Sequence, residues 1–305
     1  MKNKSIIYLL ICVIGTIQCK PIQKNISSTN FPSELVNFVP YKNNPVFAGA
    51  GQDDWDKQIR ERGYILKEGN TYHLWYTGYS NSSKDPRRFL GYATSNDGIN
   101  WNRYSKNTIH ENDWVEDMYV VKSANTYYMF AEGQGDTAHL LTSNDKIHWD
   151  EKGPLDIRQK NGSPIAKGAF GTPTVFIEKG IWYLFYERDD KGIWLASSTD
   201  HNIWTNLQDE PIIAMGPETY DQYGIAMNQV IKYKGLYYGY YHATAFKDWH
   251  EWSTNIAVSA DLIHWKKYAN NPIIGNNQSS GIVVIDGKNI QFYTMHRKVN
   301  MFLPK

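Results

Sequence analysis

Five short segments of the chain alternate apolar and polar residues and are rich in Tyr, Trp and Phe, as expected of half-buried β-strands. Each follows a turn that contains Gly or Asn; the five are residues 72–79, 127–132, 182–187, 237–242 and 290–296. A second strand candidate precedes each turn; these are residues 59–66, 116–122, 172–178, 226–233 and 281–286. The pattern therefore predicts five β-hairpins and an all-β protein.

A short motif, S-x-D-x-x-x-W, follows the first four hairpins. Its tryptophans are Trp101, Trp149, Trp204 and Trp265, which are 48, 55 and 61 residues apart. This spacing suits a unit of four short strands, as in a β-propeller blade. We expect the Asp of each copy to hold a turn and the Trp to fill the space between blades.

The fifth repeat lacks its outer part, and a matching segment lies near the N-terminus. Residues 38–45 (FVPYKNNP) have the spacing of residues 265–272 (WKKYANNP), which begin at the tryptophan of the fourth motif. We therefore expect the N-terminal segment to form the outer strand of the fifth blade, beside residues 299–303. Closing the ring in this way removes open sheet edges. The sequence predicts one five-bladed β-propeller over residues 32–305, closed by an N-terminal strand, with no second domain.

The first residues have the pattern of an export signal. Lys2 and Lys4 precede an apolar run over residues 6–17, which is too short to span a bilayer. We expect a signal peptide over residues 1–19, then a polar tether over 20–31, and an exported protein in the periplasm or on the outer surface. Cys19 stands where a bacterial lipoprotein carries its lipid anchor, although residues 16–18 match that signal poorly; an ordinary signal peptide is the alternative.

Composition excludes several classes of partner. The 305 residues include 32 Lys and Arg against 31 Asp and Glu, so the net charge of +1 gives no reason to expect nucleic acid. Aromatic residues make up 14% of the chain, which suits both β-sheets and sugar-stacking surfaces. We find no phosphate-binding loop, dinucleotide motif, HExxH or GxSxG. We expect a monomer that needs no cofactor and no metal.

Hairpin geometry predicts where the functional residues lie. If the first strand of each hairpin runs away from one face, the second returns to it, so the starts of the first strands and the ends of the second surround one mouth of the central channel. The polar residues expected there are Arg60, Glu61, Arg62, Glu116, Asp117, Glu132, Thr172, Glu187, Arg188, Asp189, Asn228, His242 and His296.

Several carboxylates around one mouth point to glycosidic bond cleavage. That reaction uses one acid to protonate the leaving oxygen and one carboxylate to activate water or attack the sugar. We assign Glu116 and Glu187 as the catalytic pair and Asp117 as a residue that tunes a pKa or holds the sugar. The expected substrate-binding residues are Arg60, Glu61, Arg62, Thr172, Arg188, Asn228, His242 and His296. Structural ion pairs and packed histidines are the alternative interpretation of these residues.

Two strings carry a family resemblance. Residues 90–101 (LGYATSNDGINW) and 72–78 (YHLWYTG) resemble the five-bladed propeller glycoside hydrolases, such as families 32, 43, 117 and 130. Residues 115–122 resemble the E/R-D-P-x-V strand on which those families keep a functional acid, so the match puts Asp117 at its position, with Met118 in place of Pro. In the third blade, families 32 and 43 have Glu before a Pro, whereas this chain has Gly171 and Thr172 before Pro173. The nearest carboxylate at the same mouth is Glu187.

A finer resemblance is to glycoside hydrolase family 137, described as β-L-arabinofuranosidases that act on a pectin side chain. It rests on residues 59–63, 115–118, 171–174 and 186–188. The resemblance implies an exo-acting hydrolase that removes one terminal sugar from a plant or other complex oligosaccharide, with β-L-arabinofuranose as the candidate sugar. Two alternatives stay open: a phosphorylase like those of family 130, in which Arg60, Arg62 and a histidine (His242 or His296) grip phosphate, and a noncatalytic glycan-binding lipoprotein.

Overall fold

The computed structural model describes residues 30–51, 54–80, 87–110 and 114–305. The expected signal peptide, both cysteines and residues 20–29 of the expected tether lie outside these ranges. Within them, no helix is both long enough and apolar enough to cross a membrane.

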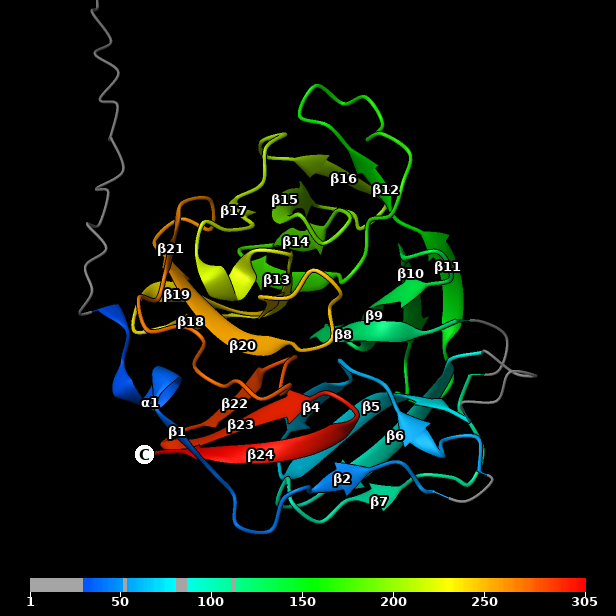
Figure 1. Ribbon diagram of the computed structural model, residues 1–305. Helices are drawn as coiled ribbons and strands as arrows, with labels where there is room; N and C mark the ends of the chain where they lie inside the picture. The colour runs from blue at the N-terminus through cyan, green and yellow to red at the C-terminus, as the bar shows by residue number, and fades with distance from the viewer. Residues whose placement is uncertain (1–29, 52–53, 81–86, 111–113) are drawn as a thin grey trace, which may run out of the picture.

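Five mostly antiparallel sheets surround a central axis, so the predicted all-β, five-bladed propeller is confirmed (Figure 1). Blade one contains β3 (Gln58–Ile59), β4 (Tyr64–Glu68), β5 (Thr71–Tyr79), β6 (Phe89–Ser95) and β7 (Asn102–Arg103). Blade two contains β8 (Glu116–Ser123), β9 (Thr126–Gly133), β10 (Thr137–Ser143) and β11 (Asp150–Pro154). Blade three contains β12 (Asp156–Arg158), β13 (Thr174–Glu178), β14 (Ile181–Glu187), β15 (Gly192–Ser198), β16 (Ile203–Asn206) and β17 (Ile213–Ala214).

The remaining two blades join the ends of the chain. Blade four contains β18 (Gly224–Tyr233), β19 (Leu236–Thr244), β20 (Ser253–Ser259) and β21 (Trp265–Lys267). Blade five contains β22 (Ile282–Asp286), β23 (Asn289–Met295), β24 (Lys298–Pro304), β1 (Phe38–Pro40) and β2 (Phe47–Ala48). The short helices are α1 (Ser33–Val36) and η2 (Thr219–Asp221).

The N-terminal strand closes the ring as predicted. β1 pairs antiparallel with β24, and Phe38 lies opposite Pro304. β2 continues the pairing, with Phe47 opposite Val299. The ring of Phe38 also stacks on that of Phe292, at 4.6 Å between centroids. Blade five therefore combines the two ends of the described chain, which protects the edge of β24.

Packing against the propeller begins before residue 32. Asn30 accepts a 2.7 Å hydrogen bond from the hydroxyl of Tyr238, and the ring of Phe31 lies 4.7 Å from that of Tyr268. Leu35 of α1 is fully buried, and its carbonyl accepts a hydrogen bond from Tyr240. Asn30 and Phe31, which fall in the expected tether, are thus part of the packed structure.

The inner strand expected over residues 59–66 is interrupted. β3 ends at Ile59 and β4 begins at Tyr64, and between them Arg62 has a left-handed φ of 54°. The Arg62 amide donates to the Met295 carbonyl of blade five, and a Cβ on Gly63 would lie 2.5 Å from the carbonyl oxygen of Trp75. The left-handed φ at Arg62 breaks the strand here, and the close approach of the Trp75 carbonyl leaves room only for glycine at residue 63.

The repeated motif is structural, as expected. In each copy the Asp Oδ1 accepts two backbone N–H bonds; for Asp97 both are 2.8 Å long. Trp149 packs edge-on against Trp75 of blade one, and Trp204 packs in the same way against Phe130 of blade two. The motif therefore holds one blade against the next.

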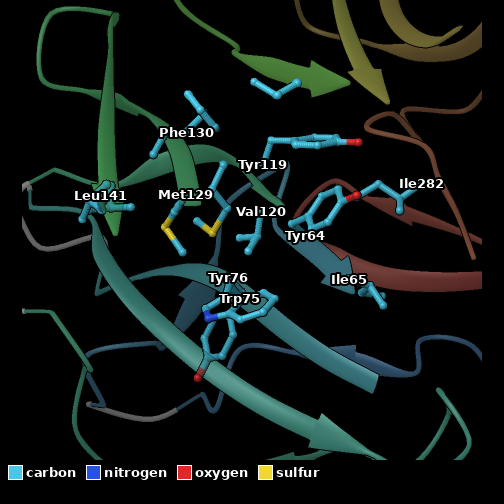
Figure 2. Packing of buried hydrophobic residues seen from close by; sticks show 14 of the residues in the cluster. Tyr64, Ile65, Trp75, Tyr76, Tyr119, Val120, Met129, Phe130, Leu141 and Ile282 are labelled. Carbon is cyan, nitrogen blue, oxygen red and sulfur yellow. The ribbon is translucent and has the colours of Figure 1, made fainter. Parts of the chain in front are cut away.

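Buried aromatic residues fill the space between blades one and two (Figure 2). The ring centroids of Tyr64 and Tyr119 lie 4.3 Å apart there. At the ends of the inner strands, Glu68 of blade one binds Lys122 at 2.8 Å and Tyr127 at 2.7 Å, both from blade two. Blades three and four repeat this contact with Glu178, Lys232 and Tyr237. These ion pairs lie away from the mouth predicted to hold the site, because they stand where the inner strands end.

Candidate active site

A cavity of about 480 Å³ opens at the predicted mouth of the channel. Its described lining holds seven carboxyl groups but only one guanidinium. The lining consists of Arg60, Glu61, Asp117, Glu132, Asp136, Ala169, Thr172, Glu187, Asp189, Asp190, His242, Trp249 and Trp252. The volume lies within the range of about 300–1,000 Å³ that is typical of small-molecule sites. The cavity is therefore large enough for a sugar and strongly acidic.

A bulge at the start of β8 separates the two neighbouring acids of blade two. The pairing of β8 with β9 shifts register between Glu116 and Tyr119, and Asp117 has a left-handed φ of 49°. Asp117 lines the cavity, and its Oδ1 is buried without a hydrogen-bond partner. Glu116 is 2% exposed and is not part of the lining.

Glu116 is held by cationic and indole groups. Its Oε2 lies 2.5 Å from Nε of Arg60, and its Oε1 accepts a 2.5 Å hydrogen bond from the indole of Trp114. Burial raises the pKa of Glu116, and Arg60 opposes that rise. Burial also holds the pKa of Asp117 well above its usual range; Arg62 opposes this rise, whereas the negative charges of Glu61 and Glu116 add to it. Asp117 is thus the acid of this pair that faces the cavity with a raised pKa.

Two successive amides of blade three hold two carboxylates from different blades. The amide of Gly171 donates to Oε1 of Glu187 at 2.8 Å, and the amide of Thr172 donates to Oε2 of Glu132 at 2.9 Å. Oε2 of Glu187 accepts a further bond of 2.6 Å from the amide of Asp190. Glu132 and Glu187 are at the ends of β9 and β14, so the hairpins bring both to the mouth.

The absence of a side chain at residue 171 makes this arrangement possible. A Cβ on Gly171 would lie 2.1 Å from Oε2 of Glu132 and 2.9 Å from Oε1 of Glu187. The residue before Pro173, Thr172, has a left-handed φ of 48° and also lines the cavity. The Gly-Thr pair that replaces the Glu of families 32 and 43 therefore leaves the space that two other glutamates occupy.

Crowding raises the pKa values of the acids on this side. Burial, followed by the charges of Asp117 and Glu116, holds the pKa of Glu132 well above its usual range. Burial also raises the pKa of Glu187, although the amides of Asp190 and Gly171 oppose it. Burial and the charge of Glu187 raise the pKa of Asp190 to about 8. Acids this close cannot all ionise together, so the group retains protons near neutral pH.

The three charged residues of blade one, Arg60, Glu61 and Arg62, each have a different partner. Arg60 lines the cavity and pairs with Glu116 of blade two. Glu61 also lines it and lies 2.7 Å from Nδ1 of His296; burial opposes ionisation, but His296 and Arg60 lower the pKa of Glu61 to about 2. Arg62 does not line the cavity: it is 1% exposed and donates across the channel to the carbonyl of Pro173 at 2.6 Å.

Of the four remaining expected binding residues, one lines the cavity and three do not. His242 lines the cavity, and burial lowers its pKa to about 3, so its imidazole is neutral. Asn228 is 1% exposed behind it, with Nδ2 2.9 Å from Nδ1 of His242. His296 stands behind Glu61, and Arg188 donates to the carbonyl of Ala166 at 3.0 Å; neither lines the cavity.

Several lining residues have no role in the sequence-based assignment: Glu132, Asp136, Asp189, Asp190, Trp249 and Trp252. Four of them lie in turns that follow the second strand of a hairpin, or at such a strand's end. The predicted strand ends placed Glu132 and Asp189 at the mouth, and the turns that follow those ends could also have indicated Asp136 and Asp190. Trp249 and Trp252 lie further along, in the connection between β19 and β20. Within the described ranges, no cluster of three or more His, Cys, Asp or Glu residues could hold a metal ion.

Comparison with proteins of known structure shows the fold. No protein-family model matches the chain. A glycosyl hydrolase from Bacteroides ovatus superposes with a TM-score of 0.73 at 14% identity, over 92% of this chain and 96% of that one. A structure from work on family 130, whose mannoside phosphorylases include hydrolases that target β-1,2-mannosidic linkages in Candida mannan, has a TM-score of 0.70 at 14% identity, over 92% and 96% of the two chains. The chain thus has the propeller fold found among glycoside hydrolases and mannoside phosphorylases.

Sequence comparison finds partial resemblance to individual enzymes. A 1,2-β-oligomannan phosphorylase from Thermoanaerobacter sp. (strain X514) is 28% identical over 217 residues, which cover 65% of this chain and 69% of that protein. A β-1,2-mannobiose phosphorylase from the same organism is 27% identical, but the match covers only 50% of this chain and 55% of that protein. The superfamily expected from the sequence is supported, whereas the finer likeness to family 137 has no support among these relatives.

Proposed function

We propose that the protein is a glycoside hydrolase that removes a terminal sugar from an oligosaccharide bound in the acidic cavity. One observation carries this proposal: Asp117, a cavity-facing carboxyl with a raised pKa and an unpartnered oxygen, shares the cavity with Glu187, whose two oxygens are held by backbone amides. A free protonated acid and an oriented carboxylate are the two groups that glycosidic cleavage requires.

In this proposal Asp117 gives its proton to the oxygen of the leaving group. Asp117 lines the cavity and is partly exposed there, so its carboxyl group can meet a substrate atom. Glu187 acts as the second carboxylate, which either takes a proton from water or attacks the sugar. Glu116 tunes the acid, since its charge raises the pKa of Asp117 from a position outside the cavity. This exchanges the roles that the sequence assigned to Glu116 and Asp117.

The charge of the cavity favours water over phosphate as the second substrate. A phosphorylase must hold a phosphate anion, which Arg and Lys side chains bind most strongly. Among the described lining residues, Arg60 is the only Arg or Lys, and it is paired with Glu116. Arg62 is beneath the cavity and His242 is neutral. Those of the seven carboxyl groups that are ionised would repel phosphate, although the sequence relatives named as phosphorylases make phosphorolysis the alternative to test.

The same charge argues for a neutral terminal sugar, because a uronic acid would meet the same repulsion. Two candidates follow: β-L-arabinofuranose, from the resemblance to family 137, and β-1,2-linked mannose, from the sequence relatives. We also propose export through the signal at residues 1–19, with a lipid anchor at Cys19.

The test is a panel of aryl glycosides, β-1,2-mannooligosaccharides and pectic arabinofuranosyl oligosaccharides, assayed in phosphate-free buffer. We expect release of a free sugar, and we expect Asp117→Asn and Glu187→Gln each to lower kcat by about 100- to 10,000-fold. Asp156→Asn is the matched control, because Asp156 pairs with Arg158 far from the lining. Turnover that requires phosphate would replace hydrolysis with phosphorolysis. Full activity in both site variants would refute the assignment.

A further inference from the structure

In the described part of the cavity lining, the aromatic residues all come from blade four. All seven carboxyl groups belong to blades one to three, whereas Trp249 and Trp252 belong to blade four. Both tryptophans are on the connection between β19 and β20, residues 245–252. The equivalent connections of blades two and five are much shorter, at residues 134–136 and 296–297. Blade four therefore adds a segment to the mouth that the propeller itself does not require.

Hydrogen bonds hold this segment in place at both ends and in the middle. The hydroxyl of Thr244 donates to the carbonyl of Glu251 at 2.7 Å, which closes the base of the loop. The amide of Trp252 donates to Asn277 at 2.9 Å. The indole of Trp249 donates to the carbonyl of Tyr223, also at 2.9 Å. The backbone of the segment and the indole of Trp249 are thus held before any ligand arrives, which lowers the entropic cost of binding.

The two tryptophans lie at different depths. Trp252 packs edge-on against His242, with ring centroids 4.9 Å apart. Trp249 is 47% exposed, and its ring lies 6.1 Å from that of Trp252. Trp249 also has a left-handed φ of 56°, an unfavourable conformation for a bulky residue. An exposed indole held in such a conformation at the edge of a cavity has the features of a binding residue.

We propose that Trp249 and Trp252 form the subsite for the sugar on the leaving-group side of the scissile bond. In this arrangement the terminal sugar meets the acids Asp117 and Glu187, and the rest of the substrate lies along the exposed indole of Trp249, which lines the same cavity. A sugar ring presents C–H groups on one face and hydroxyls at its edge, which matches an indole on one side and carboxylates on the other. The inference rests on the proposed function, and it makes the substrate an oligosaccharide rather than a simple glycoside.

The experiment compares two substrates that differ only in the leaving group. β-1,2-mannobiose is matched with mannosyl fluoride, and a pectic arabinofuranosyl disaccharide is matched with arabinofuranosyl fluoride. For the pair that the native protein hydrolyses, Trp249→Ala should lower kcat/KM for the disaccharide by about tenfold more than for the fluoride, because fluoride has no ring to stack. Trp249→Phe should restore most of the difference. Tyr104→Ala, which removes a 58% exposed ring outside the cavity, is the matched control.

Equal losses on both substrates, or none on either, would overturn the subsite. If the native protein cleaves neither pair, hydrolysis of the two candidate sugars is excluded, and calorimetric titration with the two disaccharides decides the inference by itself. Saturable binding that Trp249→Ala weakens by about tenfold would support an aromatic subsite without catalysis. No binding, or binding that the substitution leaves unchanged, would overturn it.

Discussion

Gly171→Ala tests the central geometry of the proposed site, because a single methyl group would enter the space where two carboxylates meet. The new Cβ would lie 2.1 Å from Oε2 of Glu132 and 2.9 Å from Oε1 of Glu187, and real Cβ atoms do not approach other atoms so closely. Both contacts are with the far ends of side chains, so the glutamates should move and the backbone should stay. The fold should survive while the site is disturbed.

The magnitudes follow from the bonds that would be lost. Displacing Glu132 removes the acceptor of the 2.9 Å bond from the amide of Thr172, and a buried donor left without a partner costs about 1–3 kcal/mol. For a domain of this size that is a fall in Tm of roughly 2–12 °C. A shift of about 1 Å in Glu187 should lower kcat by about 100-fold. Activity should therefore suffer far more than stability.

Thermal unfolding and steady-state kinetics on the best panel substrate would measure both effects. Gly275→Ala is the matched control, because a Cβ there has nothing within 4 Å and its φ is an ordinary one. That variant should keep native Tm and kcat. Native kcat in Gly171→Ala would show that the two carboxylates are not positioned for catalysis. Loss of cooperative unfolding would show that the backbone, and not the side chains, gives way.

Three further predictions concern the acid, the ring and the leader. Glu116→Gln removes a negative charge that raises the pKa of Asp117, and it frees Arg60, whose positive charge lowers that pKa. The alkaline limb of the pH–rate profile should therefore move to lower pH. An unmoved limb would contradict the tuning role of Glu116. Deleting residues 20–45 should cause aggregation or loss of cooperative unfolding because it removes β1 from the edge of β24, whereas deleting 20–29 should melt like the native protein; equal melting would argue against the closure. Cys19→Ser should move the protein from the membrane fraction to the soluble exported fraction, and membrane fractionation would show no change if the cysteine carries no lipid.

The relation between neighbouring acids shows where sequence reasoning stops. The strand pattern placed Glu116 and Asp117 at the mouth; in the structure Asp117 lines the cavity, whereas Glu116 is buried outside the lining. Adjacent residues on a regular strand face opposite sides, but a bulge and a left-handed φ at Asp117 decide which acid reaches the cavity. Nothing in the local pattern indicated the bulge, since it depends on pairing with β9. Arg62 is a similar case, because its partner Pro173 is across the channel.

Most strands, the blade count and the closing segment could be predicted from the sequence, because period-two alternation, turn residues and the repeated S-x-D-x-x-x-W motif are local properties of the chain. Which mouth residues share one cavity could not be predicted in this way. Gly171 is the clearest example. In the sequence, the Gly-Thr pair stands where families 32 and 43 have an acid. In the folded ring, the missing side chain at residue 171 leaves space for Glu132 of blade two and Glu187 of blade three. Distances between residues so far apart in the chain depend on how the blades pack around the axis, and no local pattern specifies that packing.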